Sequence, residues 1–239
     1  PTQNLMEAYD MKDGTPFVWN NQSNPYDNRD PRMKYTIVCN EMKWPVDPVE
    51  IWEGGTNGLP LQNATTTGYY LKKYVNNTIS FEAGSTVTKK QHNWVLFRYG
   101  EILLNYAEAM INAFHDPNYK DAVYNMSARE AVNQIRGRTN ISLPGFPSDI
   151  TEKDFVKRLK NERRVELAFE GHRFWDVRRW KELGQTANIY GVKITKNNEV
   201  ISYEKFLLET RAVTDNMYFY PIPNTERFKN PNLGQNPGW

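Results

Sequence analysis

Apolar side chains recur at steps of three and four residues through the middle of the chain, and this periodicity constrains the fold most strongly. Residues 99–114 form one such apolar stripe, and shorter stripes follow as far as residue 180. A period near 3.6 residues is that of an amphipathic helix, whose apolar face must pack against another element. We therefore predict a helical scaffold over residues 93–184.

Residue types that begin and end helices lie at the edges of these stripes. Ser127 followed by Glu130 is the capping-box pattern, and Thr151 offers a weaker cap to the next helix. His115 is predicted to end the first helix and Gly137 the second, because both lie where an apolar stripe stops.

Turn signals dominate both flanks of this scaffold. Residues 1–92 contain Asn24-Pro25 and Asn57-Gly58, with short β-prone runs at 35–38 and 69–71. They are expected to form a loop-rich ligand-face region with a few short strands. The whole chain is expected to fold as one compact, mainly α domain with long irregular loops.

The C-terminal flank, residues 185–239, is predicted to contain a hairpin followed by an extended strap. Asn197-Asn198 lies between two β-prone runs, as the turn of a hairpin does. Several prolines follow, and we expect Phe219, Tyr220 and Trp239 to hold the strap on the body.

Composition excludes several classes of protein. The chain has 239 residues, of which 39% are apolar, and no apolar run reaches 18 residues, so neither global disorder nor a transmembrane helix is expected. Cys39 is the only cysteine, which excludes a disulfide framework. The three histidines lack metal-ligand spacing, so we predict no metal site and no cofactor.

The most basic segment lies at residues 151–183, with ten Lys or Arg and seven Asp or Glu. Cations mixed with aromatic residues also occur in nucleic-acid binders. Here, however, Glu162, Glu166, Glu170 and Asp176 lie three or four residues from Arg, where helical ion pairs form. We interpret the segment as architectural, with no nucleic-acid partner. A buried Trp180 would then make Trp180→Ala cost about 3–5 kcal/mol.

Acidic residues in the N-terminal loops leave one catalytic alternative open. Two of them could act as the acid and the nucleophile of a glycoside hydrolase. Such a pair also arises by chance in an acidic loop, and GxSxG and phosphate-loop motifs are absent. The candidates lie among Trp44 and Trp52 and are Glu41, Asp47, Glu50 and Glu53.

Aromatic residues make up 13% of the chain, and several tryptophans fall in turn-rich sequence rather than on an apolar stripe. Sugar C–H faces stack on such rings, while sugar hydroxyls bond to amides and carboxylates. The alternative is that these rings anchor the loops onto the helices. We predict a ligand surface within residues 15–60, with the candidate ligand-binding residues Trp19, Trp44, Trp52, Asn20, Asn57, Glu53 and Tyr26.

Six stretches, distributed over nearly the whole chain, resemble the motifs of SusD/RagB-type proteins. The closing Asn236-Pro237-Gly238-Trp239 is similar to the usual end of these proteins. The six stretches are NPYDNRDPR (24–32), TGYYLKK (67–73), RYGEILLNYAEA (98–109), NQIRGR (133–138), ERRVELAFEGHRFWDVRRW (162–180) and YPIP (220–223).

The resemblance implies a tetratricopeptide-like helical scaffold with an irregular ligand-binding face. It implies a surface-exposed outer-membrane lipoprotein of Gram-negative bacteria that closes as a lid over a SusC-like TonB-dependent transporter. Its ligand would be a glycan or oligosaccharide, and the alternative is a subunit that captures peptides or proteins. No enzymatic activity is implied.

The resemblance covers the C-terminal half of such a protein, so we expect membrane attachment only through a lipid anchor absent from this chain. Tyr26, Asp27, Arg29 and Tyr69 fall within the shared motifs and are expected to shape the loop.

Overall fold

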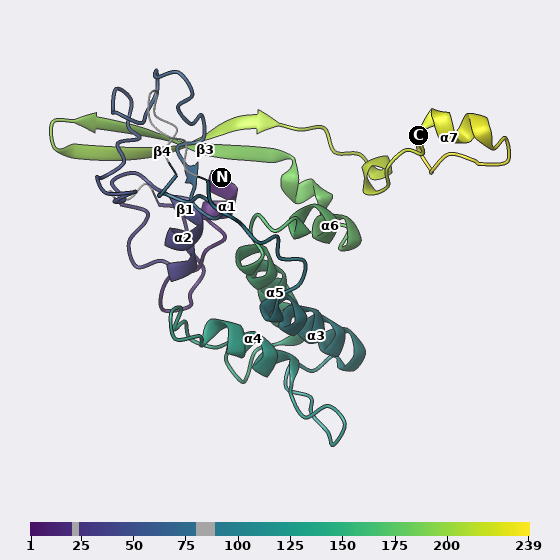
Figure 1. Ribbon diagram of the computed structural model, residues 1–239. Helices are drawn as coiled ribbons and strands as arrows, with labels where there is room; N and C mark the ends of the chain where they lie inside the picture. The colour runs from purple at the N-terminus through teal and green to yellow at the C-terminus, as the bar shows by residue number, and fades with distance from the viewer. Residues whose placement is uncertain (21–23, 80–88) are drawn as a thin grey trace.

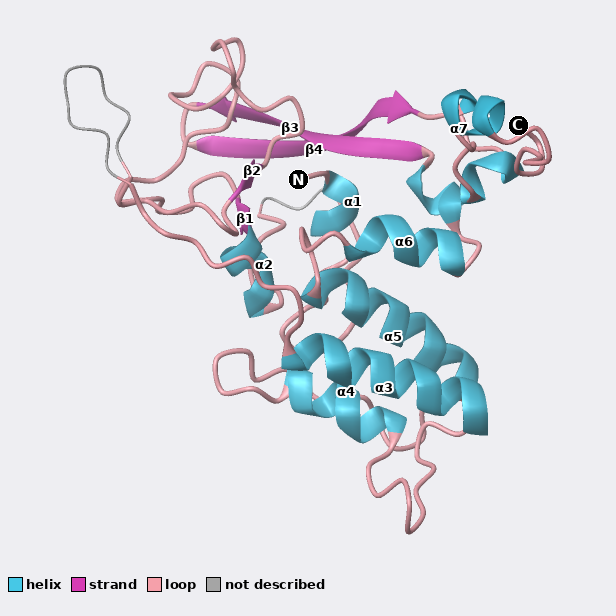
Figure 2. Cartoon of the chain, turned by 45° about the vertical axis from the view of Figure 1, so that its right-hand side comes forward, coloured by secondary structure: helices cyan, strands magenta, loops and turns pink. Residues whose placement is uncertain are grey.

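The computed structural model describes residues 1–20, 24–79 and 89–239. Helices α3, α4 and α5 lie side by side, and a long hairpin of β3 and β4 lies at the other end of the body (Figures 1 and 2). The elements are α1 (Gln3–Met6), α2 (Pro31–Thr36), β1 (Ile37–Val38), β2 (Tyr70–Leu71), α3 (Tyr99–Phe114), α4 (Ala128–Arg136), α5 (Glu152–Glu166), α6 (His172–Arg179), β3 (Asn188–Asn197), β4 (Val200–Thr210) and α7 (Asn224–Lys229).

The three long helices enclose one apolar core, and their ends agree with the sequence signals. Ser127 and Glu130 form both hydrogen bonds of a capping box at the start of α4. The Thr151 hydroxyl accepts from the Asp154 amide, and His115 closes α3 in the left-handed region, with φ 57°. The core residues include Leu104, Ala107, Ile111, Val132, Ile135, Phe155 and Leu159. The mainly α scaffold is therefore confirmed.

The first helix of the scaffold coincides with the apolar stripe, but the scaffold starts later than residue 93. It begins at Tyr99, and Trp94, Leu96 and Phe97 before it are exposed. Tyr99 and Ile102 belong to the apolar stripe, yet 68% and 49% of their surfaces are exposed. The stripe is wider than the face of α3 that packs against α4 and α5.

A second core joins the loop-rich N-terminal region to the hairpin. Its buried residues come from sequence positions far apart, including Met33, Tyr69, Val192 and Tyr203. The β-prone runs at 35–38 and 69–71 are strands in part: β1 and β2 pair antiparallel, whereas Tyr35 and Thr36 belong to α2. The predicted hairpin is also confirmed, with Asn198 in the left-handed region between longer strands than expected. The loops are therefore packed against a sheet.

The acidic residues of the basic segment pair mainly across the fold. Glu162 contacts Arg32 at 2.5 Å and Arg136 at 2.7 Å, and Glu166 contacts Arg32 at 2.9 Å. The expected pairing within the helix is therefore wrong for both glutamates, because each points away from its helical neighbours into the body. Only 3% of each glutamate side chain is exposed, so these ion pairs connect α2 to α4 and α5 inside the body.

Within α6 the pairing is partly local. Asp176 pairs with Arg179 three residues later and with Arg163 of α5, both at 2.9 Å. Full burial of Trp180, however, is wrong. The ring is half-buried, and its Nε1 donates to Glu108 at 2.8 Å. Since the ring edge already contacts solvent, Trp180→Ala is expected to cost less than the loss of a fully buried ring.

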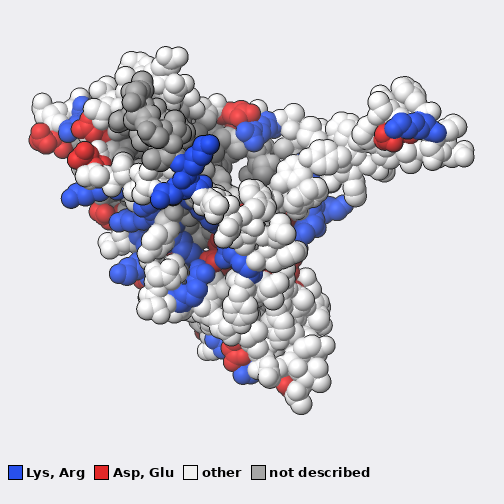
Figure 3. Space-filling view, in the orientation of Figure 1, with Lys and Arg blue, Asp and Glu red and all other residues white. Residues whose placement is uncertain are grey.

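The C-terminal strap also differs from the expectation. It contains α7 and extends away from the body, as the space-filling view shows (Figure 3). Phe219, Tyr220 and Trp239 are 57%, 60% and 48% exposed, so these rings are not buried anchors. Tyr220 stacks on Phe174 of α6 at a centroid distance of 5.7 Å, which fixes the base of the strap.

Candidate ligand-binding site

Trp52, Glu53 and Asn57 lie in one loop that packs against β3. The Glu53 amide donates to the Ile194 carbonyl at 2.9 Å, and the Glu53 carboxylate lies 3.5 Å from the Lys193 ammonium. Lys196 lies over the half-buried Trp52 ring at 4.4 Å from its centroid. One edge of the hairpin therefore positions an indole, a carboxylate and two ammonium groups together.

Hydrogen bonds within this loop fix its shape. The Asn57 side-chain oxygen accepts from the Glu50 amide at 3.1 Å, and the Asn57 carbonyl accepts from the Tyr70 hydroxyl at 2.7 Å. A cavity of about 170 Å³ opens beside Glu53 between the loop and β3. Ligand pockets usually exceed about 300 Å³, so this cavity is smaller than a typical ligand pocket.

The other two predicted indoles are half-buried as well, but they contact different neighbours. The Trp44 ring lies 4.8 Å from the Lys72 ammonium, after the end of β2. The Trp19 ring meets Phe17 edge-on, with 6.5 Å between centroids. The structure thus groups Trp52 with Glu53 and Asn57, and it attaches Trp44 and Trp19 to other parts of the loop region.

Tyr26 and Asn20 have contrasting environments. Tyr26 is 5% exposed, and its ring meets Tyr69 and Tyr203 edge-on at 6.2 and 5.4 Å. Its burial favours the loop-shaping role that the shared motif also implies. Asn20 is exposed at the end of the first described range.

The acidic residues considered for hydrolysis are partly engaged with their neighbours. The Glu50 carboxylate accepts from the Thr56 hydroxyl at 3.1 Å. Of the four candidates, Glu53 is the one that lines the cavity beside β3, counting only described residues. The described ranges also contain no group of three or more His, Cys, Asp or Glu residues that could hold a metal ion.

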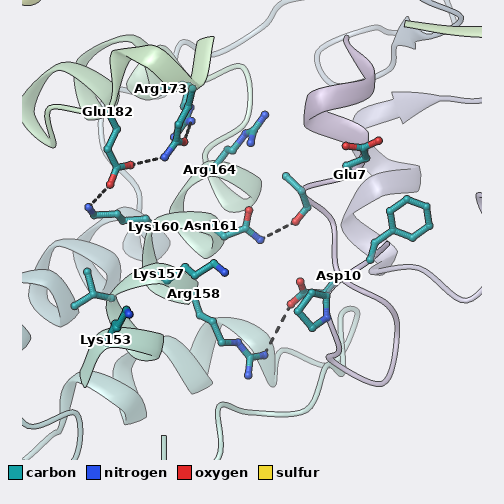
Figure 4. Close-up of a pocket in the computed structure, with 15 residues that line it drawn as sticks. Glu7, Asp10, Lys153, Lys157, Arg158, Lys160, Asn161, Arg164, Arg173 and Glu182 are labelled. Atoms are coloured by element: carbon teal, nitrogen blue, oxygen red, sulfur yellow. Dashed lines mark hydrogen bonds and ion pairs between the residues drawn. The ribbon is translucent and has the colours of Figure 1, made fainter. Parts of the chain in front are cut away.

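A larger hollow, which we call the α5 cleft, was not singled out from the sequence. It measures about 450 Å³ and lies between α5 and α6 on one side and the segment of residues 7–17 on the other (Figure 4). Its apolar lining includes Phe17, the residue that meets Trp19, and Val156. Its volume falls within the usual range of ligand pockets.

Positive charge predominates in the α5 cleft. The described residues that line it include three carboxylates, those of Glu7, Asp10 and Glu182. Glu182 pairs with Lys160 at 2.5 Å, and Glu7 pairs with Lys205 outside the lining at 2.7 Å. The cations that line it are Lys153, Lys157, Arg158, Lys160, Arg164 and Arg173.

Two guanidinium groups of the cleft have neutral hydrogen-bond partners. Arg164 donates to the Asn4 carbonyl and Arg173 to the Gln185 side-chain oxygen, each at 2.8 Å. Burial lowers the pKa of Arg164 to about 10, and the nearby charge of Arg173 acts in the same direction. Burial also lowers the pKa of Arg173, while the charges of Asp176 and Glu182 oppose that shift, so both groups stay charged at neutral pH.

Part of the signal for this cleft was present in the sequence. Lys153, Lys157, Lys160 and Arg164 recur at helical spacing and share one face of α5. The opposing wall comes from residues 7–17, about 140 positions earlier in the chain. Periodicity alone does not bring these two segments together.

Comparisons with known proteins agree with this architecture. The sequence profile of the SusD family matches residues 1–239. A solved SusD-like protein of Bacteroides fragilis superposes with a TM-score of 0.81 and 28% identity over 100% of this chain. A second, described as a SusD-like carbohydrate binding protein of the same organism, gives a TM-score of 0.72 and 26% identity over 98% of the chain.

Similarity to curated proteins supports the same family. A SusD-like protein of Formosa agariphila is 29% identical over 163 residues, which cover 66% of this chain and 28% of that protein. The chain also covers 47% and 48% of the two solved structures. It therefore spans less than half the length of these relatives. No helix among the described residues is long and apolar enough to cross a membrane.

Proposed function

This chain belongs to the SusD family, and from that membership we propose that it is a non-catalytic glycan-binding component of an outer-membrane uptake system. In this proposal the chain captures an oligosaccharide at the cell surface and delivers it to a SusC-like TonB-dependent transporter. The full protein is held at the membrane by a lipid anchor. The match to the family over residues 1–239 is the observation that carries the proposal.

Two further observations support glycan as the ligand. A relative that aligns with 98% of the chain is described as carbohydrate binding. The half-buried indoles of Trp19, Trp44 and Trp52 lie in loops beside polar side chains. Each ring is partly open, and a sugar would stack on Trp52 or Trp44 in place of the lysine ammonium that lies over it.

Within this surface we propose the loop of Trp52, Glu53 and Asn57 as the principal contact. Trp52 supplies the stacking ring, and Glu53 with Lys193 supplies hydrogen-bonding groups at the edge of the small cavity. Trp44 and Trp19, with Asn20, are proposed as secondary contacts. A few such interactions would give weak affinity, with a Kd of about 10 µM to 1 mM.

Trp52→Ala is expected to weaken glycan binding about tenfold or more, because a stacking ring and its buried area are both lost. The melting temperature should change little, since the ring is not fully buried. Calorimetric titration with an oligosaccharide panel, together with thermal unfolding, measures both effects.

Trp94→Ala is the matched control, because this indole is 84% exposed and lies outside the loop. It should leave binding unchanged. A large drop in melting temperature for Trp52→Ala with unaltered binding would instead mean that Trp52 anchors the loop. Saturable binding of peptides in place of glycans would favour a peptide-capturing role.

A further inference from the structure

We propose that the α5 cleft is a separate subsite that binds an anionic substituent, a carboxylate or a sulfate, on the captured saccharide. This inference rests on the proposed function, because it names the chemical class of the glycan. The subsite lies on α5 and α6, apart from the loop that carries Trp52.

The first argument is the contrast in how the fold treats its cations. Arg32, Arg98, Arg136 and Arg163 each form an ion pair of 2.9 Å or less with a carboxylate. In the α5 cleft, Lys153, Lys157, Arg164 and Arg173 form no ion pair with any carboxylate of the described ranges. These four arginines of the body are paired with carboxylates, and the buried Arg29 is satisfied by backbone carbonyls, whereas four cations of the cleft have no carboxylate partner within ion-pair distance in the described part of the chain.

The second argument is the placement of these unpaired cations in the cleft. Lys157 and Arg164 point from α5 into the gap that faces the segment after α1, and Arg173 approaches from α6 (Figure 4). Cations from two helices therefore line one cleft. A guanidinium offers paired N–H donors that match two oxygens of a carboxylate or a sulfate. Arg164 and Arg173 use neutral acceptors, so their charge remains for such an anion.

The third argument is the apolar part of the lining. Phe17 and Val156 border the same space, and the Arg29 guanidinium lies 3.6 Å from the Phe17 ring centroid. A sugar ring carrying one anionic group presents apolar C–H faces beside that charge, so it matches both kinds of lining. The cleft volume of about 450 Å³ holds one or two sugar rings. A small charged saccharide unit fits better than an extended nucleic-acid strand.

The test compares matched ligands by calorimetric titration of the full chain. One pair is a hexagalacturonate and the same hexamer with its carboxyl groups methyl-esterified, and the other is a sulfated dextran oligosaccharide and its unsulfated parent. The double variant Lys153→Gln, Lys157→Gln changes two exposed side chains, so it should fold normally. Lys229→Gln on α7 is the control for the loss of a distant surface ammonium group.

We expect at least one anionic ligand to bind about tenfold or more tightly than its neutral partner, because charge-assisted hydrogen bonds are the strong ones. The double variant should remove this preference while binding of the neutral ligand stays unchanged, and Lys229→Gln should preserve it. A preference within the galacturonate pair identifies the substituent as a carboxylate, and a preference within the dextran pair identifies it as a sulfate.

Equal affinity for the charged and neutral partners would overturn the subsite and leave the proposed glycan-binding function intact. If a single-stranded oligonucleotide bound as tightly as the anionic saccharide, the proposal would also be overturned, because the cleft would then recognise negative charge in general. Failure of the unaltered chain to bind any saccharide would refute the proposed function together with the subsite.

Discussion

Glu162→Ala is expected to lower the free energy of unfolding by about 3 kcal/mol, because it removes one carboxylate partner from each of two buried guanidinium groups. Glu162 bridges Arg32 and Arg136, whose side chains are 7% and 1% exposed. Removal of the carboxylate leaves two guanidinium groups in the interior with less ion-pair attraction to offset the cost of burying their charge. The same change removes the bridge between Arg32 of α2 and Arg136 of α4, while the pair of Arg32 with Glu166 remains.

Chemical denaturation of the full chain measures this effect. Glu226→Ala is the matched control, since Glu226 forms a surface pair with Lys229 on α7 and is 54% exposed. Exposed pairs of this kind contribute little. A loss for Glu162→Ala no larger than that for Glu226→Ala would contradict a structural role for the buried ion pairs.

Acid is expected to remove about 3 kcal/mol of stability through Glu166 alone. Burial by itself would raise the pKa of Glu166, but Arg32, Arg98 and Arg138 outweigh it and lower the pKa to about 2 from an ordinary value of 4.5. The folded state therefore binds this proton more weakly than the unfolded state does. The stabilisation is fully present above about pH 4.5 and is lost as the pH falls towards 2.

The free energy of unfolding, measured in steps from pH 6 to pH 2.5, tests this expectation. Glu166→Gln should lower stability at neutral pH and flatten the acid part of the profile, because the titrating group is gone. Glu162 contributes in the same direction, since its two arginines also lower its pKa despite burial. A profile with the same slope in Glu166→Gln would mean that other carboxylates control acid unfolding.

The helices were predictable because their signals are local. The stripe at 99–114 repeats every three or four residues, and the capping box at Ser127 and Glu130 and the left-handed end at His115 each involve residues within about one turn. Exposure of the stripe was not predictable in the same way. Whether Tyr99 or Trp180 is buried depends on how neighbouring elements cross, and no local pattern encodes that geometry.

The partners of the buried ion pairs were even less predictable from local sequence patterns. Glu162 and Arg32 lie 130 residues apart in sequence, so helical spacing favoured nearer partners that the fold does not use. Sequence did identify residues 151–183 as the basic segment. It could not separate the cations that are neutralised inside the body from those that line the α5 cleft.

The candidate ligand surface was predictable in part: more than the long-range ion pairs and less than the helices. The sequence placed Trp19, Trp44 and Trp52 in loops, and the structure places all three half-buried. The pairing of the Trp52 loop with Lys193 and Lys196 of β3 required the folded hairpin. The functional role of these residues stays a prediction until ligand binding is measured.

The central claim is that this chain captures glycans without cleaving them, and one paired measurement tests it most directly. The protein is titrated with a panel of oligosaccharides, and the same samples are then assayed for new reducing ends. We predict saturable binding of at least one glycan, with a Kd of about 10 µM to 1 mM, and no release of reducing ends. Release of reducing ends from the bound glycan, or binding of peptides with no glycan bound, would contradict the account.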